Sequence, residues 1–134
     1  MKRIPRATDS ELLILKILWD HQPATVRFVT EELTRLKGEE VKYTTALKLL
    51  QLMHEKGLVE RDESERSHRY SATHPREKMQ RHVLKDLASK IFGGATADLA
   101  MQALSVQKVE PEELRRLKAY IDQQLQNEEK GNDE

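Results

Sequence analysis

The apolar positions of the first part of the chain predict a first helix from Asp9 to His21. Thr8, Asp9 and Ser10 supply side-chain oxygens of the kind that cap a helix N-terminus. Leu, Ile and Trp side chains then fall on nearly every side of the segment. A helix that is apolar almost all round is buried between other elements, so we expect this one to lie inside the core.

Two more helices are expected before residue 57. After the N-cap residue Thr25, the apolar residues Val26, Val29, Leu33 and Leu36 recur at spacings of three, four and three, which predicts an amphipathic helix ending before Gly38. A third helix is predicted from Tyr43 to Lys56 with Gly57 as its stop. Its inward positions are Ala46, Leu47, Leu50 and Met53.

The hydrophobic period changes directly after Gly57. Two short strand-compatible segments, Leu58 to Asp62 and His68 to Thr73, flank a polar stretch. Three helices followed by a two-stranded hairpin is the element order of a winged helix-turn-helix. The sequence therefore predicts a mainly α fold with a small β-hairpin wing, and a winged-helix domain over residues 1–74.

The remaining chain is again helical in pattern. Each predicted helix has an apolar face, but few residues are left to pack against these faces. Pro75 suits the start of a helix, Gly93 and Gly94 interrupt it, a second helix is expected over 95–104, and Pro111 opens a last one. We expect residues 75–128 to form a helical dimerisation region and 129–134 a disordered polar tail. The expected dimerisation residues are Met79, Val83, Leu87, Ile91, Leu99, Leu104, Leu114, Leu117, Ile121 and Leu125.

Composition narrows the possible functions. Hydrophobic residues make up 37% and aromatic residues 4% of the 134 residues, so a monomer would have a thin core and oligomerisation is expected. The chain has no cysteine, which excludes disulfides, thiolate catalysis and cysteine-ligated metals. The histidines lack ligand spacing and no phosphate-binding loop is present, so we expect neither an enzyme nor a cofactor nor a metal site. Without a membrane-spanning stretch or signal peptide, a cytoplasmic location is expected.

The exposed face of the third helix is the candidate for DNA recognition. An α-helix fits the major groove, where threonine, glutamine and lysine side chains reach base edges and phosphates. The expected DNA-binding residues are Lys42, Tyr43, Thr44, Thr45, Lys48 and Gln51 at this helix, and Arg66 and Arg69 on the wing. The alternative is a winged helix used for protein–protein contact without specific DNA binding. Exposure of both Leu49 and Leu52 would favour it.

Four segments carry a resemblance to a known family. They are Leu18-Trp19, the run Tyr43-Thr-Thr-Ala-Leu-Lys48, the turn His54-Glu-Lys-Gly-Leu-Val59, and His68-Arg-Tyr70. Together they resemble the penicillinase-repressor family of winged-helix transcriptional repressors. The resemblance implies a homodimer that binds double-stranded, pseudo-palindromic operator DNA with its third helix in the major groove.

The resemblance also implies a route of release from DNA. Copper-responsive members carry a cysteine cluster near the C-terminus, which this chain lacks, so direct copper sensing is not expected. Other members are cut at an Asn-Phe bond in the dimerisation region by a membrane sensor peptidase, a zinc enzyme. The corresponding position here is Gln102-Ala103. By resemblance, such a peptidase is an expected partner and this pair the expected cleavage region. The alternative is that the protein has no protease switch and leaves DNA through a ligand or through turnover.

Overall fold

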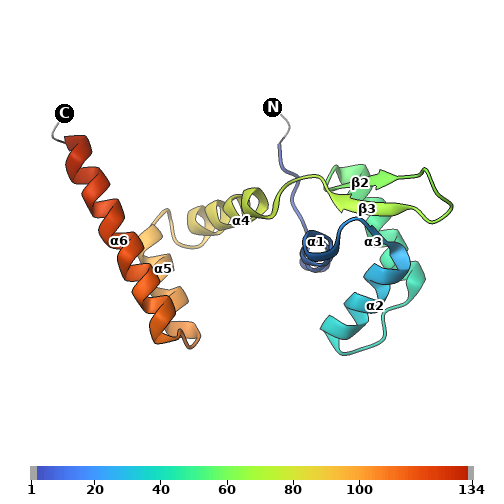
Figure 1. The fold of residues 1–134 in the computed structure, drawn as a ribbon, viewed down its shortest axis with the longest axis horizontal. Coiled ribbons are helices and arrows are strands. Elements are labelled where there is room, and N and C mark those ends of the chain that lie inside the picture. Colours follow the sequence, from blue (N-terminus) through green and yellow to red (C-terminus); the bar gives the residue numbers. More distant parts are fainter. Residues whose placement is uncertain (1–2, 133–134) are drawn as a thin grey trace. The chain divides into compact units, whose positions relative to one another are not determined.

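A computed structural model describes residues 3–132. The helices and strands follow in the order α1 (Asp9–His21), β1 (Ala24–Thr25), α2 (Val26–Lys37), α3 (Tyr43–Lys56), β2 (Val59–Asp62), β3 (Arg69–Ala72), α4 (Arg76–Lys90), α5 (Thr96–Val106) and α6 (Pro111–Asn132) (Figure 1). The chain divides into two compact units, of which the first reaches to Asp86 and the second begins at Leu87. The division falls within α4, so this helix contributes to both units.

Helix α1 is the central element of the first unit. The Thr8 hydroxyl accepts a hydrogen bond from the Glu11 amide at 3.2 Å, and the Glu11 carboxylate accepts one from the Thr8 amide at 2.8 Å. This reciprocal cap fixes the start of the helix. Further along, Ile14 and Leu18 are fully buried, and α1 contacts α2, α3 and β3. The predicted bounds of α1 and its burial between other elements are both confirmed.

Helices α2 and α3 begin and end at the residues that the sequence predicts. Gly38 and Gly57 terminate them with φ angles of 70° and 84°, a left-handed conformation that glycine adopts without strain. The buried residues are Val26, Val29 and Leu33 of α2 and Ala46, Leu50 and Met53 of α3. Leu36 differs from the expectation: it lies in the last turn before Gly38, where the chain leaves the core, and is 38% exposed.

The sheet has three antiparallel strands in the order β1-β3-β2. In the wing, β2 and β3 pair Val59 with Ala72 and Asp62 with Arg69. The additional strand β1 pairs Thr25 with Arg69. The sequence predicts only the two-stranded hairpin, because a strand of two residues is too short to show an alternating pattern. Its pairing joins the start of α2 to the wing.

The first turns of α4 belong to the core of the first unit. Met79 is 2% exposed and packs in the same cluster as the α1 residues. The indole N–H of Trp19 donates to the His74 carbonyl at 3.0 Å. Arg76 lies 5.8 Å from the centre of the Trp19 ring and pairs with Asp20. Trp19 therefore anchors the segment that connects the wing to α4.

The second unit consists of the end of α4 together with α5 and α6. Among residues 87–131 no side chain is buried within the single chain. Gly93 and Gly94, with φ angles of 57° and 85°, separate α4 from α5, as the sequence predicts. The polar tail expected from residue 129 instead continues α6 to Asn132, because Glu and Lys are good helix formers. Residues 133 and 134 lie outside the described part.

An ion pair between Glu11 and Lys56 connects the first turn of α1 to the last turn of α3. Glu11 is 3% exposed, and its Oε1 accepts a hydrogen bond from Lys56 Nζ at 2.6 Å. Burial by itself raises the pKa of Glu11, but the hydrogen bonds from Lys56 and Thr8 outweigh it, and the pKa lies below its usual value of 4.5. The pair thus ties the start of α1 to the last turn of α3.

We predict that Lys56→Met lowers the free energy of unfolding by about 1.5–3 kcal/mol at neutral pH, because a buried carboxylate loses its charged partner. The pKa of Glu11 is lower in the folded chain, so its stabilising effect is full above pH 4.5 and is lost as the pH falls through the folded value. Urea denaturation from pH 7 to pH 3 checks this. The deficit of the variant should shrink in acid, and Lys85→Met, at an exposed lysine of α4, should show none. A deficit that is constant with pH would contradict the assignment.

Candidate nucleic-acid interface

Helix α3 presents a polar face to solvent while its other face holds it in the core. Ala46, Leu50 and Met53 are fully buried. The side chains of the opposite face are all exposed: Thr44, Thr45, Lys48 and Gln51. Spacings of three and four residues place these four along one side of the helix. The structure therefore brings together the α3 residues that the sequence predicts for DNA contact.

The N-terminus of α3 is suited to an anion. Its first turn contains no acidic residue, and Lys42 at the N-cap makes no side-chain capping hydrogen bond. The Thr45 N–H donates to the Lys42 carbonyl at 3.0 Å, so the N–H groups of Tyr43 and Thr44 are the ones without an acceptor in the helix, and their partial positive charge favours phosphate. Tyr43 and Lys42 are both exposed there. This end of the helix combines backbone donors with a cationic side chain.

Of the two wing arginines predicted to contact DNA, Arg66 lies close to α3. Arg66 and Tyr43 line the same depression of about 340 Å³, together with Thr25 and Arg27 from the start of α2 and His68 of the wing. Among the residues that the structure describes, Arg66 makes no ion pair. Its guanidinium is therefore available to an anion that lies along α3 and the wing.

Arg69 lies in a different environment. It pairs in register with Asp62 and Thr25, and its Nε lies 3.8 Å from a Glu65 carboxylate oxygen. The pKa of Asp62 is lowered first by the backbone and side-chain hydrogen bonds of Ser64, with a further contribution from Arg69. Glu65 thus pairs with Arg69 and Asp62 adds nearby negative charge, whereas Arg66 has no carboxylate partner among residues 3–132. The two predicted wing contacts are not equivalent.

Sequence reasoning did not single out the start of α2. Thr25 caps this helix by accepting from the Phe28 amide at 3.2 Å, and the first turn contains no acidic residue. Arg27 is largely exposed and lies 3.5 Å from Glu31. The N-cap threonine was visible in the sequence, but the pairing of β1 with β3, which carries it to the wing, was not.

The two leucines that bear on the alternative interpretation behave differently. Leu49 is half-buried and packs against the core, whereas Leu52 is 42% exposed. The condition that would favour a protein-interaction surface, exposure of both, is not met. The solvent face of α3 is mainly polar, which favours nucleic acid.

The residues expected at a dimer interface lie mostly on exposed helix faces. Met79 is the exception, because it is buried in the core of the first unit. Leu99 is half-buried. The others are exposed apolar side chains: Val83, Leu87, Ile91, Leu104, Leu114, Leu117, Ile121 and Leu125. Gln102 and Ala103 lie exposed in the middle of α5.

No group of three or more His, Asp or Glu side chains among residues 3–132 could hold a metal ion. None of the helices in that range is long and apolar enough to cross a membrane.

Three helices followed by a β-wing, with a polar recognition face on the third helix, define a winged-helix DNA-binding protein. Residues 7–123 match the penicillinase repressor family. The chain belongs to this family of winged-helix transcriptional regulators, which are not enzymes.

One curated relative agrees with this assignment, and two solved structures are similar to parts of the chain or to most of it. The transcriptional regulator BlaI of Mycobacterium tuberculosis is 30% identical over 125 residues, which are 91% of this chain and 89% of that protein. The solution structure of the DNA binding domain of the repressor BlaI is 25% identical and covers 57% of this chain and 90% of its own, with a TM-score of 0.48. H. salinarum RosR, 21% identical, covers 90% and 96% with a TM-score of 0.53 and shares the fold.

We predict that Arg66→Ala weakens DNA binding more than Arg69→Ala does, because Arg69 already lies beside the Glu65 carboxylate and in register with Asp62. Arg66→Ala should also reduce the slope of log affinity against log salt by about one, as expected when one phosphate contact is lost. Fluorescence anisotropy with a labelled duplex at several salt concentrations measures both quantities. Lys85→Ala serves as the control for a surface charge away from α3. Equal losses for the two arginines would contradict the distinction.

Proposed function

We propose that this protein is a homodimeric repressor that binds a pseudo-palindromic operator, with α3 in the major groove and the wing on the flanking backbone. The observation that carries the proposal is the exposed face of Thr44, Thr45, Lys48 and Gln51 on α3. Arg66 lines a depression with Tyr43 of the same helix and makes no ion pair with any residue that the structure describes. Threonine and glutamine can read base edges, and lysine and arginine can contact phosphates or guanine. The face therefore combines side chains that can read bases with side chains that can contact phosphates, as binding in the major groove requires.

Phosphate contacts position such a protein and base contacts make it selective. Lys42, Lys48 and Arg66 serve the first role in this proposal, together with the free N–H groups of α3. Thr44, Thr45 and Gln51 serve the second. Because each neutralised phosphate releases a counterion, affinity should fall steeply with salt, by about 10³- to 10⁵-fold between 50 and 200 mM for 6 to 10 contacts.

Dimerisation through α4, α5 and α6 is supported by the exposed apolar side chains of the second unit. Ile91 is 71% exposed and Leu125 57%. Each square ångström of apolar surface removed from water contributes about 25 cal/mol, so a second copy that covers these faces would gain substantially. A two-fold dimer would present two α3 helices in opposite senses, which is the symmetry of a palindromic site.

Release by proteolysis is the proposed end of repression. By the family resemblance, a membrane sensor peptidase would cleave at Gln102-Ala103, which lies in α5. A protease requires several residues in extended form, so the helix must open first. Two features favour opening: Ala95 gives α5 no side-chain cap, and α5 has no buried residue within the single chain. A short helix without such support is marginal by itself.

We predict that Ile121→Lys converts the dimer to a monomer at micromolar concentration and lowers affinity for the operator at least tenfold, because two half-sites no longer bind as one particle. Sedimentation velocity and anisotropy measure the two effects. Gln126→Lys adds the same charge to α6 away from the apolar stripe and should change neither. A wild-type protein that sediments as a monomer would contradict the proposal.

We also predict that limited proteolysis of the native protein begins between residues 93 and 104, where Gly93 and Gly94 border α5, a short helix without a side-chain cap. Mass spectrometry of the first fragments identifies the cut. Cleavage near Gln102-Ala103 should separate the dimer and reduce DNA affinity. First cuts confined to the wing and the chain after Asn127, with 93–104 protected, would contradict it.

A further inference from the structure

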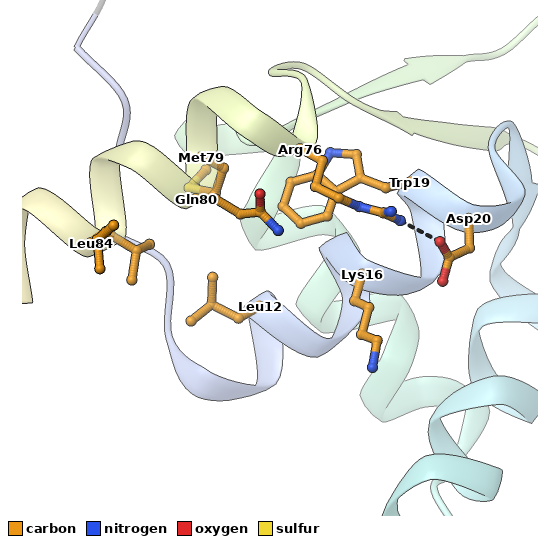
Figure 2. A pocket seen from close by; sticks show the side chains of 9 residues that line it. Leu12, Lys16, Trp19, Asp20, Arg76, Met79, Gln80 and Leu84 are labelled. Carbon is orange, nitrogen blue, oxygen red and sulfur yellow. Dashed lines mark hydrogen bonds and ion pairs between the residues drawn. The ribbon is translucent and has the colours of Figure 1, made fainter. Parts of the chain in front are cut away.

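A groove of about 470 Å³ lies between α1 and the first half of α4, inside the first unit. This volume falls within the range of small-ligand sites in proteins, about 300 to 1,000 Å³. Figure 2 shows the two helices with the lining side chains between them. The groove lies away from the polar face of α3, and DNA recognition leaves it unused.

The groove has a defined length and direction. Leu12 of α1 lies at the same end as Leu84 of α4, and Asp20 lies at the other end, where it pairs with Arg76 (Figure 2). On each helix these residues are eight positions apart, which corresponds to about 12 Å at 1.5 Å per residue. The occupant is therefore an elongated molecule.

The two ends differ in chemistry. Leu12, Val83 and Leu84 give one end an aliphatic lining. The Gln80 amide lies over the middle of the groove, between the aliphatic end and Trp19 (Figure 2). The ring of Trp19 is covered by the Arg76 guanidinium at 5.8 Å. The lining thus suits a flexible aliphatic chain better than a flat ring that would stack on the indole.

The charges at the groove leave a positive surplus. Asp20 balances Arg76 through their ion pair. Lys16, on the α1 edge, is exposed and makes no ion pair or hydrogen bond with any residue that the structure describes, and its charge adds to that of Arg76 in lowering the pKa of Asp20. Its ammonium points to solvent in Figure 2, and the flexible side chain can turn toward the groove. An anionic head group complements this edge.

We infer that the groove binds an aliphatic carboxylate of medium chain length. The hydrocarbon chain lies against Leu12 and Leu84, and the carboxylate accepts hydrogen bonds from the Gln80 amide and the Lys16 ammonium. Val83 borders the same end of the groove and is the lining residue shared with the proposed dimer interface. Because α4 continues from the first unit into the second, such a ligand contacts the helix that connects them and is suited to an effector. Carboxylate binding in the groove does not depend on operator recognition by α3. A failed titration would therefore leave the proposed repressor function untouched, and the reverse also holds.

The chain's single tryptophan makes the groove directly observable, because Trp19 lines it. We propose titrating the full-length protein, without DNA, with hexanoate, octanoate and decanoate and following Trp19 fluorescence. The expected result is saturable binding that tightens by roughly fourfold for each methylene group that is buried. The neutral 1-decanol should bind roughly tenfold more weakly than decanoate, because it gains nothing from the positive edge.

An isosteric pair of variants tests the position of the carboxylate. Gln80→Glu keeps the shape of the side chain and places a negative charge beside the proposed head group, so decanoate affinity should fall at least tenfold. Gln126→Glu makes the same change at an exposed position of α6 and should leave it unchanged. Thermal unfolding of both variants shows whether the fold is intact.

Three results would overturn the inference. The first is a non-saturable response. The second is equal affinity of wild type and Gln80→Glu for decanoate. The third is no change in Trp19 fluorescence with any of the acids, which is the result expected if a second copy of this chain fills the groove instead.

Discussion

The second unit has apolar surface without a core of its own, and this constraint shapes the rest of the protein. From residue 87 to 131 no side chain is buried within the single chain, although Leu and Ile recur along α4, α5 and α6. Short helices in water owe most of their stability to packing of an apolar face. In the proposed dimer a second copy of the chain covers this surface, so we expect assembly and folding of this part to be coupled.

The first unit differs from the second, because its hydrophobic core is formed entirely within one chain. α1 is buried against α2, α3 and β3, and Met79 closes the core from α4. This frame holds α3 rigidly by Ala46, Leu50 and Met53 while its other face stays polar. A recognition helix needs both properties, since its side chains must reach bases from a fixed backbone. The wing and the start of α2 are joined to the same frame by β3.

Local signals were sufficient for the helices and the wing, and long-range pairing explains what they missed. Thr25, Gly38 and Gly57 mark helix ends by local chemistry, so α1, α2 and α3 have the predicted bounds. The pairing of β1 with β3 joins residues distant in sequence and leaves no periodic pattern. Met79 illustrates the same limit: its four-residue spacing with Val83 places it on an apolar stripe, but only the fold shows that α1 covers it. The sequence places both Arg66 and Arg69 on the wing. Only the strand register shows that Arg69 lies beside acidic residues, whereas Arg66 lies in the turn near α3.

The central claim is that two copies of α3 read one duplex, and hydroxyl-radical footprinting tests it most directly. The experiment uses the full-length protein on a duplex that it selects from a random pool. We expect two protected half-sites related by two-fold symmetry, with centres separated by about 10 base pairs or a multiple of that spacing. Protection of one unsymmetrical segment, with a single chain bound per duplex, would contradict the claim.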